Sequence, residues 1–216
     1  MLPTLLLLDL KNAFNSIERS AILDAIYKYC PMLLRWFAWS YGVPSKLSFG
    51  EFTVLSKQGV QQGDPLGSFL FAISIQDCIM AVHSLPGVVW SGWYADDGTI
   101  QAPLPILDRA LAVLATSLSA CNIAINPTKS KIVTQSLMNV DLYDNLKGLV
   151  RVPLEDGFPL LGGHVPGSAL PSFLQGKFEE FRLLCSKISR LSEAHIACIL
   201  CCVLVLMPAE LITFYV

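Results

Sequence analysis

The adjacent acids Asp96 and Asp97 lie between two short apolar runs, so we expect them at the tip of a β-hairpin. The run at 88–90 precedes them and the run at 99–100 follows them. An Asp-Gly step favours a tight turn, which explains one aspartate but not two, because neighbouring carboxylates repel unless a cation lies between them. Mg²⁺ is the natural cation, since it binds carboxylate oxygens together with substrate phosphates. Taken alone, the segment is also typical of a solvated turn.

The order of strand and helix patterns predicts an α+β fold. Residues 4–10 form a continuous apolar run that ends in Asp9 and Leu10, typical of a strand buried on both faces. Helices are predicted at 19–29, 31–41, 65–82 and 107–118, a hairpin at 46–55, and short strands at 123–125 and 131–133. This order matches a split βαβ, ferredoxin-like sheet with helices on one face. In that layout the first strand and the acidic hairpin are neighbours, which brings Asp9 toward Asp96.

Composition limits the possible settings of this fold. The chain has 216 residues, of which 53% are hydrophobic and 15% charged, so it is either a membrane protein or the apolar centre of a larger assembly. The longest uncharged stretches, at 2–8 and 196–208, are too short to span a bilayer, and no membrane partner is expected. The net charge of −2 does not indicate a general nucleic-acid-binding surface. The seven cysteines lack the spacing of a disulfide framework, which is typical of an intracellular setting.

Five short segments combine into one pattern. An acid at a strand end is followed five residues later by an aromatic, and the later segments are a Gln/Gly loop, the acidic hairpin, a loop with a lysine and a Leu-Gly step. Each segment alone is a weak signal, but their order and separations together are specific. They are residues 9–14, 58–67, 94–97, 126–130 and 160–163.

At these residues the chain resembles a reverse transcriptase of the non-LTR retrotransposon type, whose palm motifs are lettered A to E in this order. The resemblance implies a polymerase palm over residues 1–165 and a thumb-like helical segment over 166–216. It implies an RNA-directed DNA polymerase that joins nucleotides to a primer 3′-hydroxyl by two-metal transfer. The partners would be an RNA template, a DNA primer and deoxynucleoside triphosphates, in the nucleus or cytoplasm.

The resemblance also implies a metal site. Asp9 and Asp96 would be the first ligands of Mg²⁺, for which Mn²⁺ can substitute. Asp97 would lie beside them, and the Leu10 carbonyl would assist. Holding two metals about 3.5–4 Å apart requires carboxylates from different strands, so Asp9 and Asp96 are expected to converge. The competing interpretation of Asp9 is a strand-end or capping residue.

The remaining motif residues would handle the substrates. Phe14 would stack under the incoming sugar and exclude a 2′-hydroxyl, or serve as a core aromatic, or both. Gln58-Gly59 would line the pocket of the new base pair, with glycine allowing close backbone approach. Lys129 would offer a proton or positive charge to the departing pyrophosphate, although a solvated surface lysine fits equally. Leu161-Gly162 would form the primer grip.

Four cations on the predicted thumb helices have two interpretations. They can contact template–primer phosphates, or they can form an ordinary solvated face. These residues are Lys177, Arg182, Lys187 and Arg190.

The pattern departs from the family before Asp9, where only a few residues precede motif A. We therefore expect the fingers region and its triphosphate-binding cations to be missing from this chain, and the fingers of the parent polyprotein to be a partner. We also expect the chain as given not to polymerise at a useful rate. Three alternatives stay open: an inactive retroelement remnant with a palm fold, an RNA-dependent RNA polymerase-like palm, and a membrane-associated helical protein. The bulky Phe14 counts against the second.

Overall fold

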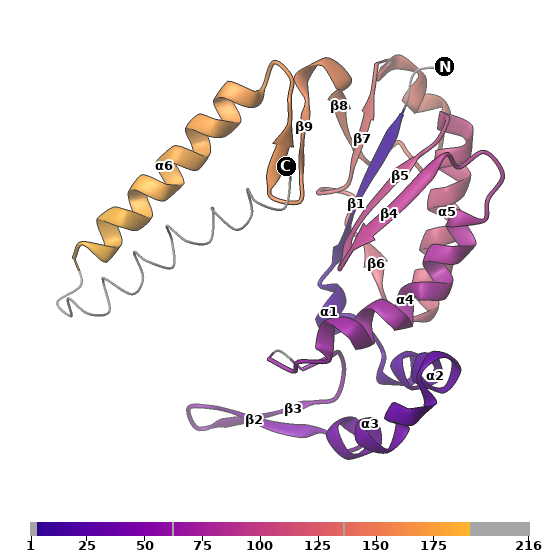
Figure 1. The fold of residues 1–216 in the computed structure, drawn as a ribbon, viewed down its shortest axis with the longest axis vertical. Helices are drawn as coiled ribbons and strands as arrows, with labels where there is room; N and C mark the ends of the chain where they lie inside the picture. Colours follow the sequence, from indigo (N-terminus) through magenta and orange to yellow (C-terminus); the bar gives the residue numbers. More distant parts are fainter. Residues whose placement is uncertain (1–3, 62, 136, 191–216) are drawn as a thin grey trace. The chain divides into compact units, whose positions relative to one another are not determined.

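The computed structural model describes residues 4–61, 63–135 and 137–190 (Figure 1). It is a mixed α/β structure that divides into two compact units, Met1–Glu155 and Asp156–Val216. The division falls before the predicted palm boundary at residue 165. Most of the helical segment expected after that boundary, residues 191–216, lies outside the described residues.

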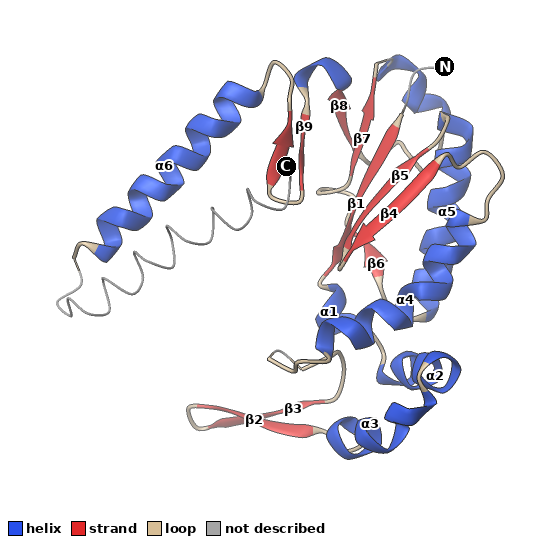
Figure 2. Cartoon of the chain, in the orientation of Figure 1, coloured by secondary structure: helices blue, strands red, loops and turns tan. Residues whose placement is uncertain are grey.

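A six-stranded sheet forms the centre of the first unit (Figure 2). Its order is β4-β5-β1-β7-β8, with β6 also paired to β1. The central strand runs antiparallel to β5, β6 and β7, while β7 and β8 are parallel. The strands are β1 (Leu5–Lys11), β4 (Trp90–Tyr94), β5 (Asp97–Gln101), β6 (Ala124–Ile125), β7 (Lys131–Thr134) and β8 (Val150–Pro153). The structure therefore confirms that the first strand and the acidic hairpin are neighbours.

The alternation of side chains along β1 separates a core face from a site face. Leu6, Leu8 and Leu10 are buried in the main hydrophobic core. Side chains two residues apart share a face of a strand, so Leu7 and Asp9 lie on the opposite face. The central strand thus carries its acid on the face turned away from the core.

The helices are α1 (Ala13–Ser16), α2 (Arg19–Tyr29), α3 (Leu34–Tyr41), α4 (Gly67–His83) and α5 (Leu104–Ala120), with 3₁₀ turns at Pro31–Leu33, Leu137–Leu142 and Leu154–Asp156. Helices α4 and α5 pack against each other and against the sheet, whereas α2 packs on α4 and α3 packs on α2 (Figure 2). Helix α5 buries Leu107, Ala110, Leu111, Leu114 and Leu118, as its amphipathic pattern predicts.

Helix α4 begins at Gly67, slightly later than the predicted start at Asp64-Pro65. The Asp64 carboxylate accepts a hydrogen bond from the Leu66 N–H at 2.9 Å, so it closes the turn that leads into the helix. A separate hairpin of β2 (Ser45–Phe49) and β3 (Phe52–Ser56) precedes this loop, as predicted.

The second unit begins with a hairpin of β9 (Phe158–Leu160) and β10 (Gly163–Val165). Leu161 and Gly162 form its two-residue turn, and both have positive φ, 48° and 83°. Helix α6 (Leu170–Ile188) follows. Within the described part of the chain, no helix combines the length and the apolar character that crossing a membrane requires.

The loop after β3 is bound closely to α1. The Val60 N–H donates to the Phe14 carbonyl and the Gly59 N–H to the Ile17 carbonyl, both at 2.9 Å. Gly59 has φ 73°, and a Cβ atom placed on it would lie 2.7 Å from backbone atoms of Asn15. Only glycine allows this approach, because real Cβ atoms do not come so close to backbone.

Tyr41 connects α3 to the same loop. Its buried hydroxyl donates to the Asp64 carboxylate and accepts from the Gln61 N–H at 3.1 Å. The Arg19 guanidinium lies over the Tyr41 ring, 5.1 Å from the centroid. Burial, with the Asp64 hydrogen bond, raises the pKa of Tyr41 to about 12. The network holds the loop against the helices of the first unit.

Substituting Gly59 by alanine should destabilise the first unit by more than the same change at Gly63. Both glycines have positive φ, so both variants carry the strain of that backbone, about 1–2 kcal/mol. A Cβ at Gly63 meets open space, whereas one at Gly59 meets the backbone of α1. Urea unfolding of the two variants measures the difference. Equal losses would show that α1 and the loop are not in close contact.

Deprotonation of Tyr41 should make stability depend on pH in the alkaline range. The pKa in the folded protein, about 12, lies above the ordinary value of about 10. The stabilising contribution is therefore complete below about pH 10 and is lost as the pH rises through about 12, by about 1.4 kcal/mol per pH unit. Urea unfolding of wild type and Tyr41→Phe over this range isolates the effect. Parallel pH profiles would contradict it.

Candidate functional site

The acidic hairpin turns two residues before the Asp97-Gly98 step that the sequence suggests. Tyr94 pairs with Asp97, so Ala95 and Asp96 form the two-residue turn, and Ala95 has φ 53°. The prediction that Asp-Gly would make the turn is wrong, because Gly98 lies inside β5. A Cβ on Gly98 would meet the Trp93 ring at 2.6 Å, so this glycine makes room for the indole.

The register of β1 and β5 brings acids of two segments together. Asp9 pairs with Asp97, and residues directly opposite each other in an antiparallel pair point to the same face. Asp97, rather than Asp96, is therefore the direct neighbour of Asp9. Burial raises the pKa of the Asp97 carboxyl, and the charges of Asp96 and Asp9 raise it further. The positive charge of Lys129 opposes this rise, and a bound cation would act in the same direction as Lys129.

These acids do not form a closed metal cage. Among the described residues, no group of three or more His, Cys, Asp or Glu side chains is placed to hold one ion. Mg²⁺ does not require such a cage, because one or two carboxylates together with waters and substrate phosphates complete its shell. The pair of acids at the β1–β5 register fits a site of this open kind. Leu10, the predicted assisting residue, pairs with Ile125 and has a buried side chain.

The loop between β6 and β7 contacts both the carboxylate and the backbone of Asp9. The Asn126 side-chain amide donates to Asp9 Oδ1 at 3.0 Å, and the Lys129 ammonium lies 3.8 Å from Asp9 Oδ2. Ser130 is fully buried and accepts a hydrogen bond from the Asp9 N–H at 3.1 Å. We did not assign Asn126 or Ser130 a role from sequence, although both lie in the fourth motif. The available signal was the polar segment Asn126-Pro127-Thr128-Lys129-Ser130 between two short strand patterns.

A cavity of about 330 Å³ joins three of the five motifs. Phe14 lines it and stacks on Phe71 in the core, with ring centroids 4.4 Å apart. Phe14 therefore contacts both the core and the cavity, while its predicted contact with the incoming sugar stays a prediction. The lining residues are Asn12, Ala13, Phe14, Asn15, Val60, Gln61, Gly63, Asp64, Gly67, Ser68 and Asp96.

The second motif contributes to this cavity through residues other than those predicted. Gln58 and Gly59 are not among the lining residues. The Gln58 side-chain amide donates to the Ser16 carbonyl at 2.6 Å and to the Glu18 carboxylate at 3.0 Å. Gly59 is in contact with α1, so both residues contact the segment that lines the cavity and do not line the cavity themselves. Their contact with a nucleotide stays a prediction.

The predicted primer-grip residues belong to the second unit. Leu161 and Gly162 form the β9–β10 turn, beside a largely apolar cavity of about 310 Å³. The cavity is lined by Leu160, Leu161, Gly163, His164, Val165 and Pro166.

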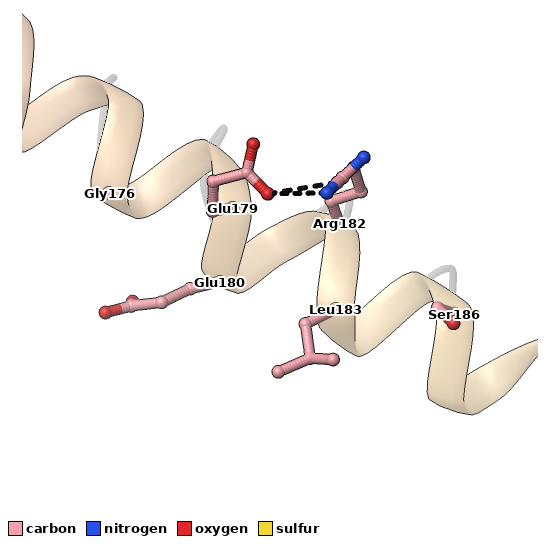
Figure 3. Close-up of a pocket in the computed structure, with 6 residues that line it drawn as sticks. All are labelled: Gly176, Glu179, Glu180, Arg182, Leu183 and Ser186. Atoms are coloured by element: carbon pink, nitrogen blue, oxygen red, sulfur yellow. Dashed lines mark hydrogen bonds and ion pairs between the residues drawn. The ribbon is translucent and has the colours of Figure 1, made fainter.

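Two of the four cations predicted to contact phosphates are paired on α6 itself. Arg182 forms an ion pair with Glu179 at 2.9 Å (Figure 3), and Lys177 forms one with Glu180 at 2.8 Å. Both pairs are largely exposed, so the interpretation of these two cations as a solvated face gains support.

Comparisons with known proteins agree with the motifs. The family model described as reverse transcriptase (RNA-dependent DNA polymerase) matches residues 3–165. The retrotransposable element SLACS 132 kDa protein of Trypanosoma brucei gambiense is 32% identical over 139 residues, which cover 60% of this chain and 12% of that protein. The retrovirus-related Pol polyprotein from type-1 retrotransposable element R2 of Bradysia coprophila is 33% identical over 140 residues, which cover 59% of this chain and 16% of that protein.

The chain thus spans less than a fifth of the length of these relatives. A solved telomerase structure from Candida albicans, in complex with a fragment of telomeric RNA, matches with a TM-score of 0.47 and 12% identity. That match covers 78% of this chain and 30% of the telomerase chain. The family model extends over most of the sequence and includes all five motifs, and the chain therefore belongs to the reverse transcriptase (RNA-dependent DNA polymerase) family.

Proposed function

We propose that this chain is part of an RNA-directed DNA polymerase of a retrotransposon, with a palm over residues 1–165 and a thumb-like segment over 166–216. The observation that carries the proposal is the β1–β5 register, in which Asp9 lies opposite Asp97. The adjoining turn residue, Asp96, lines a cavity together with Phe14. Acids that two strands bring together, next to a turn acid that lines a cavity with an aromatic wall, suit the transfer of a nucleotide to a primer 3′-hydroxyl.

The proposed cofactor is Mg²⁺, for which Mn²⁺ can substitute. Asp9 and Asp97, which the β1–β5 register brings together, would be one pair of ligands, and Asp96 and the Leu10 carbonyl are the further ligands that the motifs suggest. The crowding of like charges that raises the pKa of Asp97 supports a cation at this place. When bound, the metal would neutralise phosphate charge and activate the primer hydroxyl. The acids themselves hold and orient the reacting groups on the site face of β1, away from the core.

Phe14 is the proposed selector of the sugar. Its ring is held by stacking on Phe71, and α1, which carries it, is braced by the loop that contains Gly59. A wall with so little freedom to move would exclude a ribose 2′-hydroxyl by steric contact. Deoxynucleoside triphosphates are therefore the proposed substrates.

The other proposed roles follow the motifs. Lys129, close to Asp9 and largely exposed, would offer a proton or charge to the pyrophosphate. Gln58-Gly59 would act at the new base pair, and Leu161-Gly162 would grip the primer. An RNA template and a DNA primer are the proposed nucleic-acid partners, and the fingers of the parent polyprotein are a proposed protein partner.

Primer extension tests the proposed function. A parent protein that contains this chain is supplied with a primed RNA template, deoxynucleotides and Mg²⁺ or Mn²⁺. Asp96→Asn should lower extension by about 100-fold or more, because loss of even an outer partner of a metal site costs 10–100-fold. Asp144→Asn is the matched control, since Asp144 is a highly exposed acid that pairs with Lys147. Extension that survives Asp96→Asn, or that is absent from the wild-type parent, would contradict the proposal.

The same assay tests the sugar selector. Phe14→Val should admit ribonucleotides into the product, because the smaller side chain leaves room for a 2′-hydroxyl. The variant should also lose some stability, less than the about 3–5 kcal/mol typical of a buried Phe→Ala change. Phe52→Val, at an exposed position of β3, controls for the loss of an aromatic ring. Unchanged selection in a folded Phe14→Val variant would leave Phe14 as a core residue only.

A further inference from the structure

The pairing along one side of β1 is interrupted beside Asp9. Strand β7 pairs with β1 up to Leu7, opposite Lys131, and β6 resumes the pairing at Leu10, opposite Ile125. Between these pairs β1 advances by three residues, whereas the facing chain uses six. Three extra residues therefore loop out, and the loop replaces regular ladder bonds at the proposed metal ligand.

The residues at the two ends of this loop form hydrogen bonds with the carbonyl and the N–H of Asp9. The Asn126 N–H donates to the Asp9 carbonyl at 2.8 Å, and the Asp9 N–H donates to Ser130 Oγ at 3.1 Å. The Ser130 N–H closes the loop on the Asn126 carbonyl at 2.9 Å. Ser130 is fully buried, so this closure is shielded from water.

The Asn126 side chain holds one oxygen of the Asp9 carboxylate. Its amide donates to Oδ1 at 3.0 Å, while the Thr128 hydroxyl donates to the Asn126 Oδ1 atom at 2.8 Å. Because the amide oxygen already accepts from Thr128, the NH₂ group is the end directed at Asp9. The other oxygen, Asp9 Oδ2, has the Lys129 ammonium at 3.8 Å, beyond hydrogen-bond distance, so it remains available to a cation.

We propose that Asn126 is a positioning residue, which fixes the rotamer of the Asp9 carboxylate so that Oδ2 faces the cation, with Thr128 orienting the amide. The inference rests on the proposed function, in which Asp9 is a metal ligand. A carboxylate with one oxygen held loses less rotational freedom when it binds a metal. Outer partners of metal ligands act in this way, and their removal typically costs 10–100-fold in affinity.

Mn²⁺ binding to the chain of residues 1–216 tests the inference without an activity assay. Free Mn²⁺ is followed by electron paramagnetic resonance during titration. Asn126→Leu, which keeps the branched shape and removes the donor, should weaken Mn²⁺ binding about 10-fold. Thr128→Val should weaken it in the same direction by a smaller factor, because the amide can still donate. Asp9→Asn removes the proposed ligand itself, so its loss of Mn²⁺ affinity is the reference against which the other two variants are compared.

Asn145→Leu is the matched control. Asn145 makes the same kind of bond, from its side-chain amide to the Asp108 carboxylate at 3.0 Å, outside the candidate site. If the Asn126 bond only stabilises the fold, Asn126→Leu and Asn145→Leu should lower the metal-free unfolding temperature alike and leave Mn²⁺ affinity unchanged. That result, together with weaker binding in Asp9→Asn, would overturn the positioning role while the proposed function stands.

Two further outcomes are decisive. If Asp9→Asn itself leaves Mn²⁺ affinity unchanged, Asp9 is not a ligand, and the inference falls together with the proposed metal site. If Asn126→Leu does not fold, shown by the absence of a cooperative unfolding transition, Thr128→Val decides. Affinity equal to wild type in that variant would overturn the inference.

Discussion

The antiparallel pairing of β1 with β5 is the interaction on which the rest of the candidate site depends. It sets Asp9 opposite Asp97 and thereby joins two segments that lie far apart in the sequence. The same strand is central in the sheet and buries Leu6, Leu8 and Leu10 in the core. A shift of this register by one residue would turn the acid toward the core and the leucines toward the site. Burial of the core face therefore secures the position of the acids.

The site concentrates negative charge in a place where charge is unfavourable. The pKa of Asp97 is raised for this reason, because burial and two neighbouring carboxylates oppose its ionisation. Two groups offset this negative charge in part: the Asn126 amide donates to the Asp9 carboxylate, and the Lys129 ammonium lies 3.8 Å from its other oxygen. A bound cation would neutralise the remaining negative charge. A cluster of acids in which one carboxylate oxygen is held by an amide suits a metal whose shell is completed by water and substrate phosphate.

The wall of the cavity is rigid for separate reasons. Phe14 stacks on the core, Gly59 lets the following loop contact α1, and Tyr41 ties that loop to α3. Each contact uses groups that are buried or tightly bonded, so a substrate would meet a surface that is already in place. Positioning of this kind supports selection by shape, which is the role proposed for Phe14.

The sequence by itself determined most of the elements between residues 5 and 134, whereas α1 and the strands β8, β9 and β10 were not predicted. The apolar run of β1, the amphipathic pattern of α5 and the order of the five motifs were all readable, because burial imposes a local period on a strand or helix. Only the tertiary structure decided that Ala95 and Asp96 make the turn, that Asp97 faces Asp9, that Gln58 turns away from the cavity, and that Asn126 holds the Asp9 carboxylate. These features depend on the register between distant strands and on side-chain bonds across loops. A local pattern carries no information about either, because the pairing free energy depends on residues that are not neighbours in the chain.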